Sequence, residues 1–195
     1  MAGLETTKRP VAWLRVPAEE ELPPEVRGLF AAAEEKLGFV PNVFRVFALR
    51  PQHLLRWREY FDELVFGEDS GLTAAQREMI AVVVSSRNHC HYCLTSHGAG
   101  LRELTGDPVL AEQIAHNYRH AGLPEKERAM LDFAVEMTER TSEGEPADVD
   151  ALRRAGWTDE EIMDIGEVAA MFNFTNRLAN AFGWVPNEEY HSLGR

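Results

Sequence analysis

Cysteine is scarce in this sequence. Only two of the 195 residues are cysteines, Cys90 and Cys93, and together they form one C-x-x-C pair. A secreted domain stabilised by disulfides would carry several cysteines spread along the chain, so the sequence excludes a protein of that class. An isolated C-x-x-C pair indicates redox chemistry or a metal site instead. The cysteine pair therefore narrows the function more than any other feature of the composition.

Basic residues are also few. The chain has 20 lysines and arginines against 32 aspartates and glutamates, which gives a formal net charge of -12 at pH 7. A surface of this sign repels the phosphate backbone of nucleic acids and the anionic headgroups of membranes. We therefore expect no nucleic-acid partner and no membrane partner.

Long hydrophobic runs are absent as well. The longest uninterrupted apolar run covers residues 79–84, far short of the ~20 residues that a helix needs to span a bilayer. The N-terminal residues are polar and show neither the apolar stretch nor the small-residue cleavage site of a secretory signal. Both absences predict a cytoplasmic protein. The hydrophobic content of 45% suffices for the core of one globular domain.

The sequence nowhere keeps the alternation of apolar and polar residues that is typical of a β-strand, whereas apolar residues recur at helical spacing. We therefore predict an all-α fold with a single helical domain over residues 25–195. The predicted helices cover residues 25–37, a segment that begins near residue 42, 51–66, 74–86, 89–104, 109–118, 125–141, 148–155, and a last long helix after Thr158.

Residues 1–24 are predicted to form an N-terminal arm. The segment contains prolines at positions 10, 17, 23 and 24 and the acidic run 19–21, so it cannot hold a regular helix. Such an arm lies on the surface of its own domain or crosses to a partner subunit. Together with the apolar excess of the helices, the arm predicts a homo-oligomer.

A weak internal repeat predicts a duplicated helical architecture. Thr73 and Thr158 are each followed three residues later by Gln or Glu, which is the capping-box pattern of a helix start. When the two copies are aligned on these threonines, Thr175 and Leu178 of the second copy correspond to the two cysteines of the first copy. If the chain arose by duplication, only its first half therefore kept the reactive cysteines.

The candidate site combines the cysteine pair with a nearby histidine. On one helix, Cys90, Cys93 and His97 share a face about two turns long, so both sulfurs and one imidazole can act together. A cysteine reacts as its thiolate, and its pKa falls from about 8.5 toward ~3.5–7.5 near a helix N-terminus or a cation. Helix position alone favours Cys90 as the thiolate. Attack on a peroxide gives a sulfenic acid, and the second thiol condenses with it to form a disulfide.

The pattern of Glu78, Cys90-x-x-Cys93 and His97 resembles the alkylhydroperoxidase D-like, peroxidase-related branch of the carboxymuconolactone decarboxylase superfamily. The segment 172–183 adds to the resemblance, which covers roughly residues 41–183. It implies an all-helical fold, a homo-oligomer, and a relay in which Glu78 and His97 move protons to and from the cysteine pair. It also implies that Cys93 forms the sulfenic acid and that Cys90 is the proton donor and resolving thiol.

One position departs from the motif of the family, which has a histidine immediately before the second cysteine. Here that position is Tyr92, and a histidine stands one residue earlier, at His91. Neighbouring side chains on a helix point about 100° apart, so His91 does not replace the missing imidazole. Because of this departure, the resemblance does not establish the complete proton relay of the family or its electron donor for this chain.

We therefore predict a thiol-dependent hydroperoxide reductase or disulfide reductase, with a hydroperoxide as substrate and a thiol or protein reductant as partner. No cofactor is expected. The cysteines could instead bind a structural zinc ion, which needs four ligands. No second C-x-x-C motif and no H-x-x-x-H motif supplies the remaining ligands, so no metal is expected. Two other functions remain as alternatives: an acid–base lyase of the carboxymuconolactone decarboxylase type and a non-catalytic redox sensor.

Overall fold

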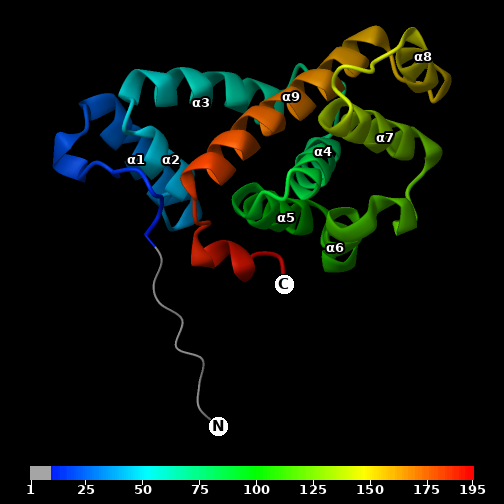
Figure 1. The fold of residues 1–195 in the computed structure, drawn as a ribbon. Coiled ribbons are helices and arrows are strands. Elements are labelled where there is room, and N and C mark those ends of the chain that lie inside the picture. Colours follow the sequence, from blue (N-terminus) through cyan, green and yellow to red (C-terminus); the bar gives the residue numbers. More distant parts are fainter. Residues whose placement is uncertain (1–9) are drawn as a thin grey trace.

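The computed structural model describes residues 10–195 and consists of packed helices (Figure 1). No residue of this part of the chain is in a β-strand, so the predicted all-α fold is confirmed. The α-helices are α1 (Pro24–Leu37), α2 (Asn42–Phe47), α3 (Pro51–Phe66), α4 (Ala74–Arg87), α5 (His91–Thr105), α6 (Pro108–Asn117), α7 (Glu125–Glu139), α8 (Pro146–Arg154) and α9 (Asp159–Phe182). The 3-10 helices are η1 (Glu19–Glu21), η2 (Tyr118–His120) and η3 (Glu188–His191).

The helix ends follow the capping signals of the sequence. The Thr73 hydroxyl accepts a hydrogen bond from the Gln76 N–H at 3.2 Å, and the Gln76 side chain accepts one from the Thr73 N–H at 2.9 Å. Thr158 and Glu161 make the same reciprocal pair at the start of α9. Gly183 ends α9 with φ 63°, a left-handed conformation that glycine adopts without steric cost. Local chemistry therefore determines where the long helices begin and end.

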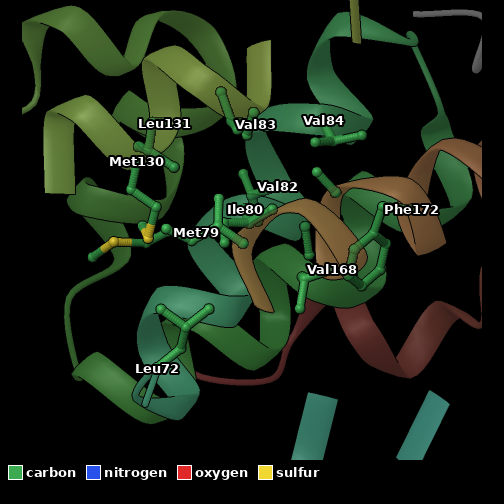
Figure 2. Packing of buried hydrophobic residues seen from close by; sticks show 14 of the residues in the cluster. Leu72, Met79, Ile80, Val82, Val83, Val84, Met130, Leu131, Val168 and Phe172 are labelled. Atoms are coloured by element: carbon green, nitrogen blue, oxygen red, sulfur yellow. The ribbon is translucent and has the colours of Figure 1, made fainter. Parts of the chain in front are cut away.

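α4 is the central helix of the fold (Figure 1) and packs against α3, α5, α6, α7 and α9. Residues 80–84 are fully buried, because neighbouring helices cover every face of α4. This placement explains the uninterrupted apolar run in the sequence, since each such side chain contributes roughly 1.5–3 kcal/mol on burial. Figure 2 shows side chains of α4 packed between those of α7 and α9, among them Ile80, Val82, Met130, Leu131, Val168 and Phe172.

The two copies of the internal repeat contact each other through residues at corresponding positions. Asn88, which caps the C-terminus of α4, donates a hydrogen bond from Nδ2 to Oδ1 of Asn173 in α9 at 2.9 Å. These two residues lie at the offset that joins the threonine caps of α4 and α9. In the first half the helix breaks after Asn88, where His89 has a φ of 50°, whereas α9 continues without a break. The break separates α4 from α5 and creates the turn that carries the first cysteine.

The described part of the N-terminal arm, residues 10–23, packs on its own domain. The Trp13 N–H donates to the carbonyl oxygen of Phe182 at 2.8 Å, and the Val185 N–H donates to that of Val11 at 2.9 Å. Residues 10–18 are non-helical, as the prolines predict, and η1 follows as a single 3-10 turn. The remainder of the predicted arm, residues 1–9, lies outside the described residues. The arm thus covers the C-terminal end of α9, close to the cysteine pair.

Apolar side chains remain exposed on the outer faces of several helices, including Met163 and Phe174 of α9. No helix within residues 10–195 is both long enough and apolar enough to cross a membrane. The predicted homo-oligomer stays a prediction, and these exposed side chains are where a helix-mediated contact would find apolar area to bury.

Candidate active site

A cavity of about 360 Å³ lies at the junction of α1, α3, α4 and α5 and is closed on one side by η3. Glu78, Cys93 and His97 line it, so three of the four predicted site residues share one space. Most of the remaining wall is apolar, and includes Leu29, Ala33, Val43, Phe44, Trp57 and Phe61. An apolar cavity with a few convergent polar groups is typical of a small-molecule site.

Glu78 and His97 form a close pair across α4 and α5. The Nδ1 atom of His97 lies 2.7 Å from Oε2 of Glu78, and both side chains are largely buried. The imidazole ring packs edge to face on Phe172, with ring centroids 4.5 Å apart. Within residues 10–195 the other ring nitrogen, Nε2, makes no hydrogen bond. A carboxylate that orients one nitrogen of a histidine leaves the other free to exchange protons, which is the geometry of a general acid–base pair.

Gly100 makes room for the carboxylate of Glu78. A Cβ atom at this position would lie 3.0 Å from Oε1 of Glu78 and 3.1 Å from its Cδ, closer than side chains normally approach. Gly100 follows His97 on the same face of α5, so the helix that carries the imidazole also accommodates its partner. Any larger residue here would have to displace Glu78.

The two cysteines occupy different positions around the start of α5. Helix α5 begins at His91, later than the predicted residue 89, because His89 is left-handed and Cys90 is extended. Cys90 therefore precedes the helix as its N-cap, and it is completely buried among side chains that include Ala12 of the arm. Cys93 lies in the first turn, is 4% exposed and lines the cavity. Both thiols are free, and only the Cys93 side chain faces the cavity.

The two thiols interact, and their pKa values move in opposite directions. A hydrogen bond from the Cys93 thiol lowers the pKa of Cys90 to about 7, against the effect of burial, and the charge of His97 contributes further. The same hydrogen bond and burial raise the pKa of Cys93 above its ordinary value. The first thiolate thus forms on Cys90, with the remaining proton held between the two sulfurs.

This electrostatic arrangement predicts the pH dependence of thiol reactivity. A pKa lowered to about 7 means that the pair carries a thiolate above this pH and loses it as the pH falls below. We expect the rate of alkylation by iodoacetamide, followed by intact mass, to rise with pH with a midpoint near 7. The unfolded chain is the control, with an expected midpoint at about 8.5. A native midpoint equal to that of the unfolded chain would contradict the assignment.

Two polar residues of α9 at the site, Thr175 and Asn176, were not among the predicted site residues, although they lie in the segment 172–183 that adds to the resemblance. Asn176 is fully buried, donates to the Ser85 hydroxyl at 3.1 Å, and accepts from Nδ2 of Asn88 at 3.0 Å. The side chains of Asn176 and Thr175 also lower the pKa of Cys93, in opposition to the larger effects that raise it. Besides the resemblance of that segment, the signal for Asn176 is its place on the buried face of α9, where an asparagine is unexpected among apolar residues.

Tyr92, the residue that departs from the family motif, makes a structural contact between two helices. Its hydroxyl accepts a hydrogen bond from the N–H of Val43 at 2.9 Å, near the start of α2. Its ring packs edge to face on Trp184. Tyr92 therefore ties α5 to α2 at the wall of the cavity, and among residues 10–195 the imidazole that lines this cavity is that of His97.

Within residues 10–195, no three side chains of His, Cys, Asp or Glu gather closely enough to share a metal ion. His97, which lines the cavity with Cys93, directs Nδ1 to Glu78. A tetrahedral structural zinc site needs four ligands, and this cluster offers no such set.

Comparison with known protein families gives two matches to the carboxymuconolactone decarboxylase family, over residues 51–121 and 110–186. The two segments together span most of the chain and contain all four predicted site residues. The chain belongs to the carboxymuconolactone decarboxylase family. Two matches within one chain also agree with the internal duplication, since each half corresponds to a copy of the carboxymuconolactone decarboxylase repeat.

Solved structures place the chain within the alkylhydroperoxidase D-like part of this family, as predicted. An uncharacterized peroxidase-related protein from Silicibacter sp. TM1040 is 44% identical, with a TM-score of 0.93 over 99% of this chain and 100% of the other. The alkylhydroperoxidase AhpD core, an uncharacterized peroxidase-related protein from Ralstonia eutropha JMP134, is 41% identical, with a TM-score of 0.92 over 96% and 98%.

A more distant structure shares the fold alone. The debrominase Bmp8, solved in complex with 2,3,4-tribromopyrrole, is 18% identical, with a TM-score of 0.76 over 97% of each chain. A comparison with curated proteins finds no match. The same helical fold therefore also occurs in a protein named for a different reaction, so the chemistry of this chain has to be argued from its own site.

Proposed function

We propose that this chain is a thiol-dependent hydroperoxide reductase that cycles Cys93 and Cys90 between dithiol and disulfide. The observation that carries the proposal is the arrangement around Cys93. Its side chain lines an apolar cavity, a second thiol is hydrogen-bonded behind it, and the Glu78–His97 pair lines the same cavity. Nucleophile, resolving thiol and acid–base pair are thus within one site.

The first step places the negative charge on the sulfur that substrate can reach. The Cys90 thiolate takes the proton of Cys93 through their hydrogen bond, which leaves a thiolate on Cys93. This sulfur attacks the terminal oxygen of the hydroperoxide, so an S–O bond forms and the O–O bond breaks. Sulfur is oxidised by two electrons and the peroxide is reduced. The departing alkoxide takes a proton from His97, which had accepted that proton from the Cys90 thiol when the thiolate formed.

The second step closes the disulfide. The Cys90 sulfur attacks the sulfenic acid on Cys93, an S–S bond forms, and the hydroxyl leaves with the Cys90 proton as water. Two equivalents of an external thiol then return the disulfide to the dithiol and are themselves oxidised to a disulfide. The same exchange, run with a different disulfide partner, is the disulfide reductase activity. Cytoplasmic surroundings, where thiols are kept reduced, suit this cycle.

Thiol titration and intact mass measured before and after a small excess of cumene hydroperoxide test the proposal. We expect the loss of both thiols and a mass decrease of about 2 Da, since an internal disulfide removes two hydrogens. Repeated turnover with a small thiol as reductant would separate an enzyme from a redox sensor, which is oxidised once without consuming more peroxide. Retention of both thiols under these conditions would reject the proposal.

A further inference from the structure

Tyr190 is a phenol held at the cavity by the C-terminal segment. It lies in η3, where its carbonyl oxygen accepts a hydrogen bond from Nη2 of Arg102 at 2.9 Å. Arg102, a buried residue of α5, also donates to the carbonyl oxygen of Leu193 at 3.0 Å. The Tyr190 ring packs edge to face on Phe39, with centroids 5.0 Å apart. The backbone and ring of Tyr190 are therefore fixed by contacts that do not involve its hydroxyl.

The hydroxyl of Tyr190 has no hydrogen-bond partner within residues 10–195, although the side chain lines the cavity with Cys93, His97 and Glu78. The three other tyrosines of the chain differ in this respect. Tyr92 accepts from the Val43 N–H, Tyr118 donates to Asp132, and Tyr60 donates to Glu167. Tyr190 is partly buried, so its hydroxyl can hydrogen-bond with solvent or with a molecule bound in the cavity. Of the two tyrosines that line the cavity, Tyr92 accepts a hydrogen bond from Val43, whereas the hydroxyl of Tyr190 makes none within residues 10–195.

We propose that Tyr190 is a catalytic residue whose hydroxyl donates a hydrogen bond to the hydroperoxide oxygen that leaves as alkoxide. The inference rests on the proposed peroxide reduction. As the Cys93 sulfur forms its bond to the terminal oxygen and the O–O bond breaks, negative charge develops on the other oxygen. A fixed neutral donor in an apolar cavity stabilises that charge without any rearrangement during the reaction.

The surroundings of Tyr190 suit a donor that keeps its own proton. Burial, and then the negative charge of Glu78, raise the pKa of Tyr190 above its ordinary value, so the phenol is neutral throughout the working pH range. The alkoxide receives its proton from His97, and Tyr190 contributes only the hydrogen bond. The two residues therefore have separate roles at the same oxygen.

The experiment compares Tyr190→Phe with wild type in two reactions of the same thiol. Stopped-flow oxidation by cumene hydroperoxide produces an alkoxide, whereas alkylation by iodoacetamide releases iodide, which needs no hydrogen-bond donor. We expect oxidation to slow by about 100-fold and alkylation to proceed at the wild-type rate. Tyr60→Phe, which removes an exposed phenol bonded to Glu167, is the matched control and should leave both rates unchanged. Thermal melting of each variant confirms the fold.

Three other outcomes would overturn the inference in distinguishable ways. Equal oxidation rates for Tyr190→Phe and wild type would reject the role of Tyr190 and leave the peroxidase proposal intact. An equal slowing of oxidation and alkylation would show that Tyr190 acts on the thiolate or on packing, and not on the leaving oxygen. Wild-type oxidation no faster than that of a free thiol would reject the proposed function, and the role of Tyr190 with it.

Discussion

Cys93→Ser should abolish oxidation by hydroperoxide, whereas Cys90→Ser should still form a sulfenic acid on Cys93 and never a disulfide. The difference follows from burial, because the Cys93 side chain lines the cavity and Cys90 is sealed beneath the arm and α2. A serine hydroxyl has no reactive anion near neutral pH, so the loss at Cys93 should be on the order of 10³-fold or more. Trapping of sulfenic acid with dimedone, followed by mass spectrometry, measures both variants.

Cys90→Ser should also react more slowly than wild type at neutral pH. The hydrogen-bonded pair shares one proton, and loss of Cys90 removes the group that takes the proton from Cys93. The pH profile of sulfenic acid formation in this variant should therefore shift upward. If dimedone instead labels Cys90 in Cys93→Ser and nothing in Cys90→Ser, the order of the two thiols is reversed.

Glu78→Gln and His97→Ala should each slow peroxide-driven disulfide formation by about 10²–10⁴-fold, the usual contribution of a positioned acid–base group. The Glu78 carboxylate orients His97 through the 2.7 Å contact at Nδ1, and His97 delivers the proton to the alkoxide. The double variant should be little slower than either single variant, since both substitutions interrupt the same proton transfer. The measurement is the rate of disulfide formation against pH for wild type and the three variants.

Two further variants sharpen this test. Gly100→Ala leaves both side chains of the pair in place but directs a methyl group at the Glu78 carboxylate, so it should lower the rate by displacing that carboxylate. Glu59→Gln removes an exposed carboxylate of α3 that pairs only with Arg56, and it should react as wild type does. A wild-type rate for Glu78→Gln at every pH would make Glu78 an ordinary buried helix residue and refute the relay.

The helices could be predicted from the sequence because their signals are local. The hydroxyl of Thr73 and the side chain of Gln76 satisfy backbone groups within one turn, and the left-handed Gly183 stops α9 regardless of distant contacts. The spacing of Cys93 and His97 within α5 is likewise a property of one helix. Such features need no knowledge of what packs against them.

Contacts between segments that are distant in the sequence could not be predicted from the sequence. Asn176 reaches the cysteines from α9, and Tyr190 reaches the cavity from the C-terminal 3-10 helix through the anchor at Arg102. Asn176 lies in the segment 172–183 that adds to the resemblance, but nothing in its spacing points to the cysteines, and Tyr190 lies outside every motif named above. Their positions follow from how α9 and η3 pack on α5, which no local pattern specifies.

The sequence by itself determined the all-α class, most of the helix ends, the internal duplication, and the set of two thiols, one imidazole and one carboxylate, of which Cys93 and His97 lie one turn apart on α5. The tertiary structure alone decided which thiol reaches the cavity. The left-handed turn at His89 places Cys90 before α5, and the arm and α2 then cover it, while Cys93 faces the cavity. The physical reason is that helical periodicity is set by hydrogen bonds within a few residues, whereas burial and the pKa of a thiol depend on groups brought together from the whole chain.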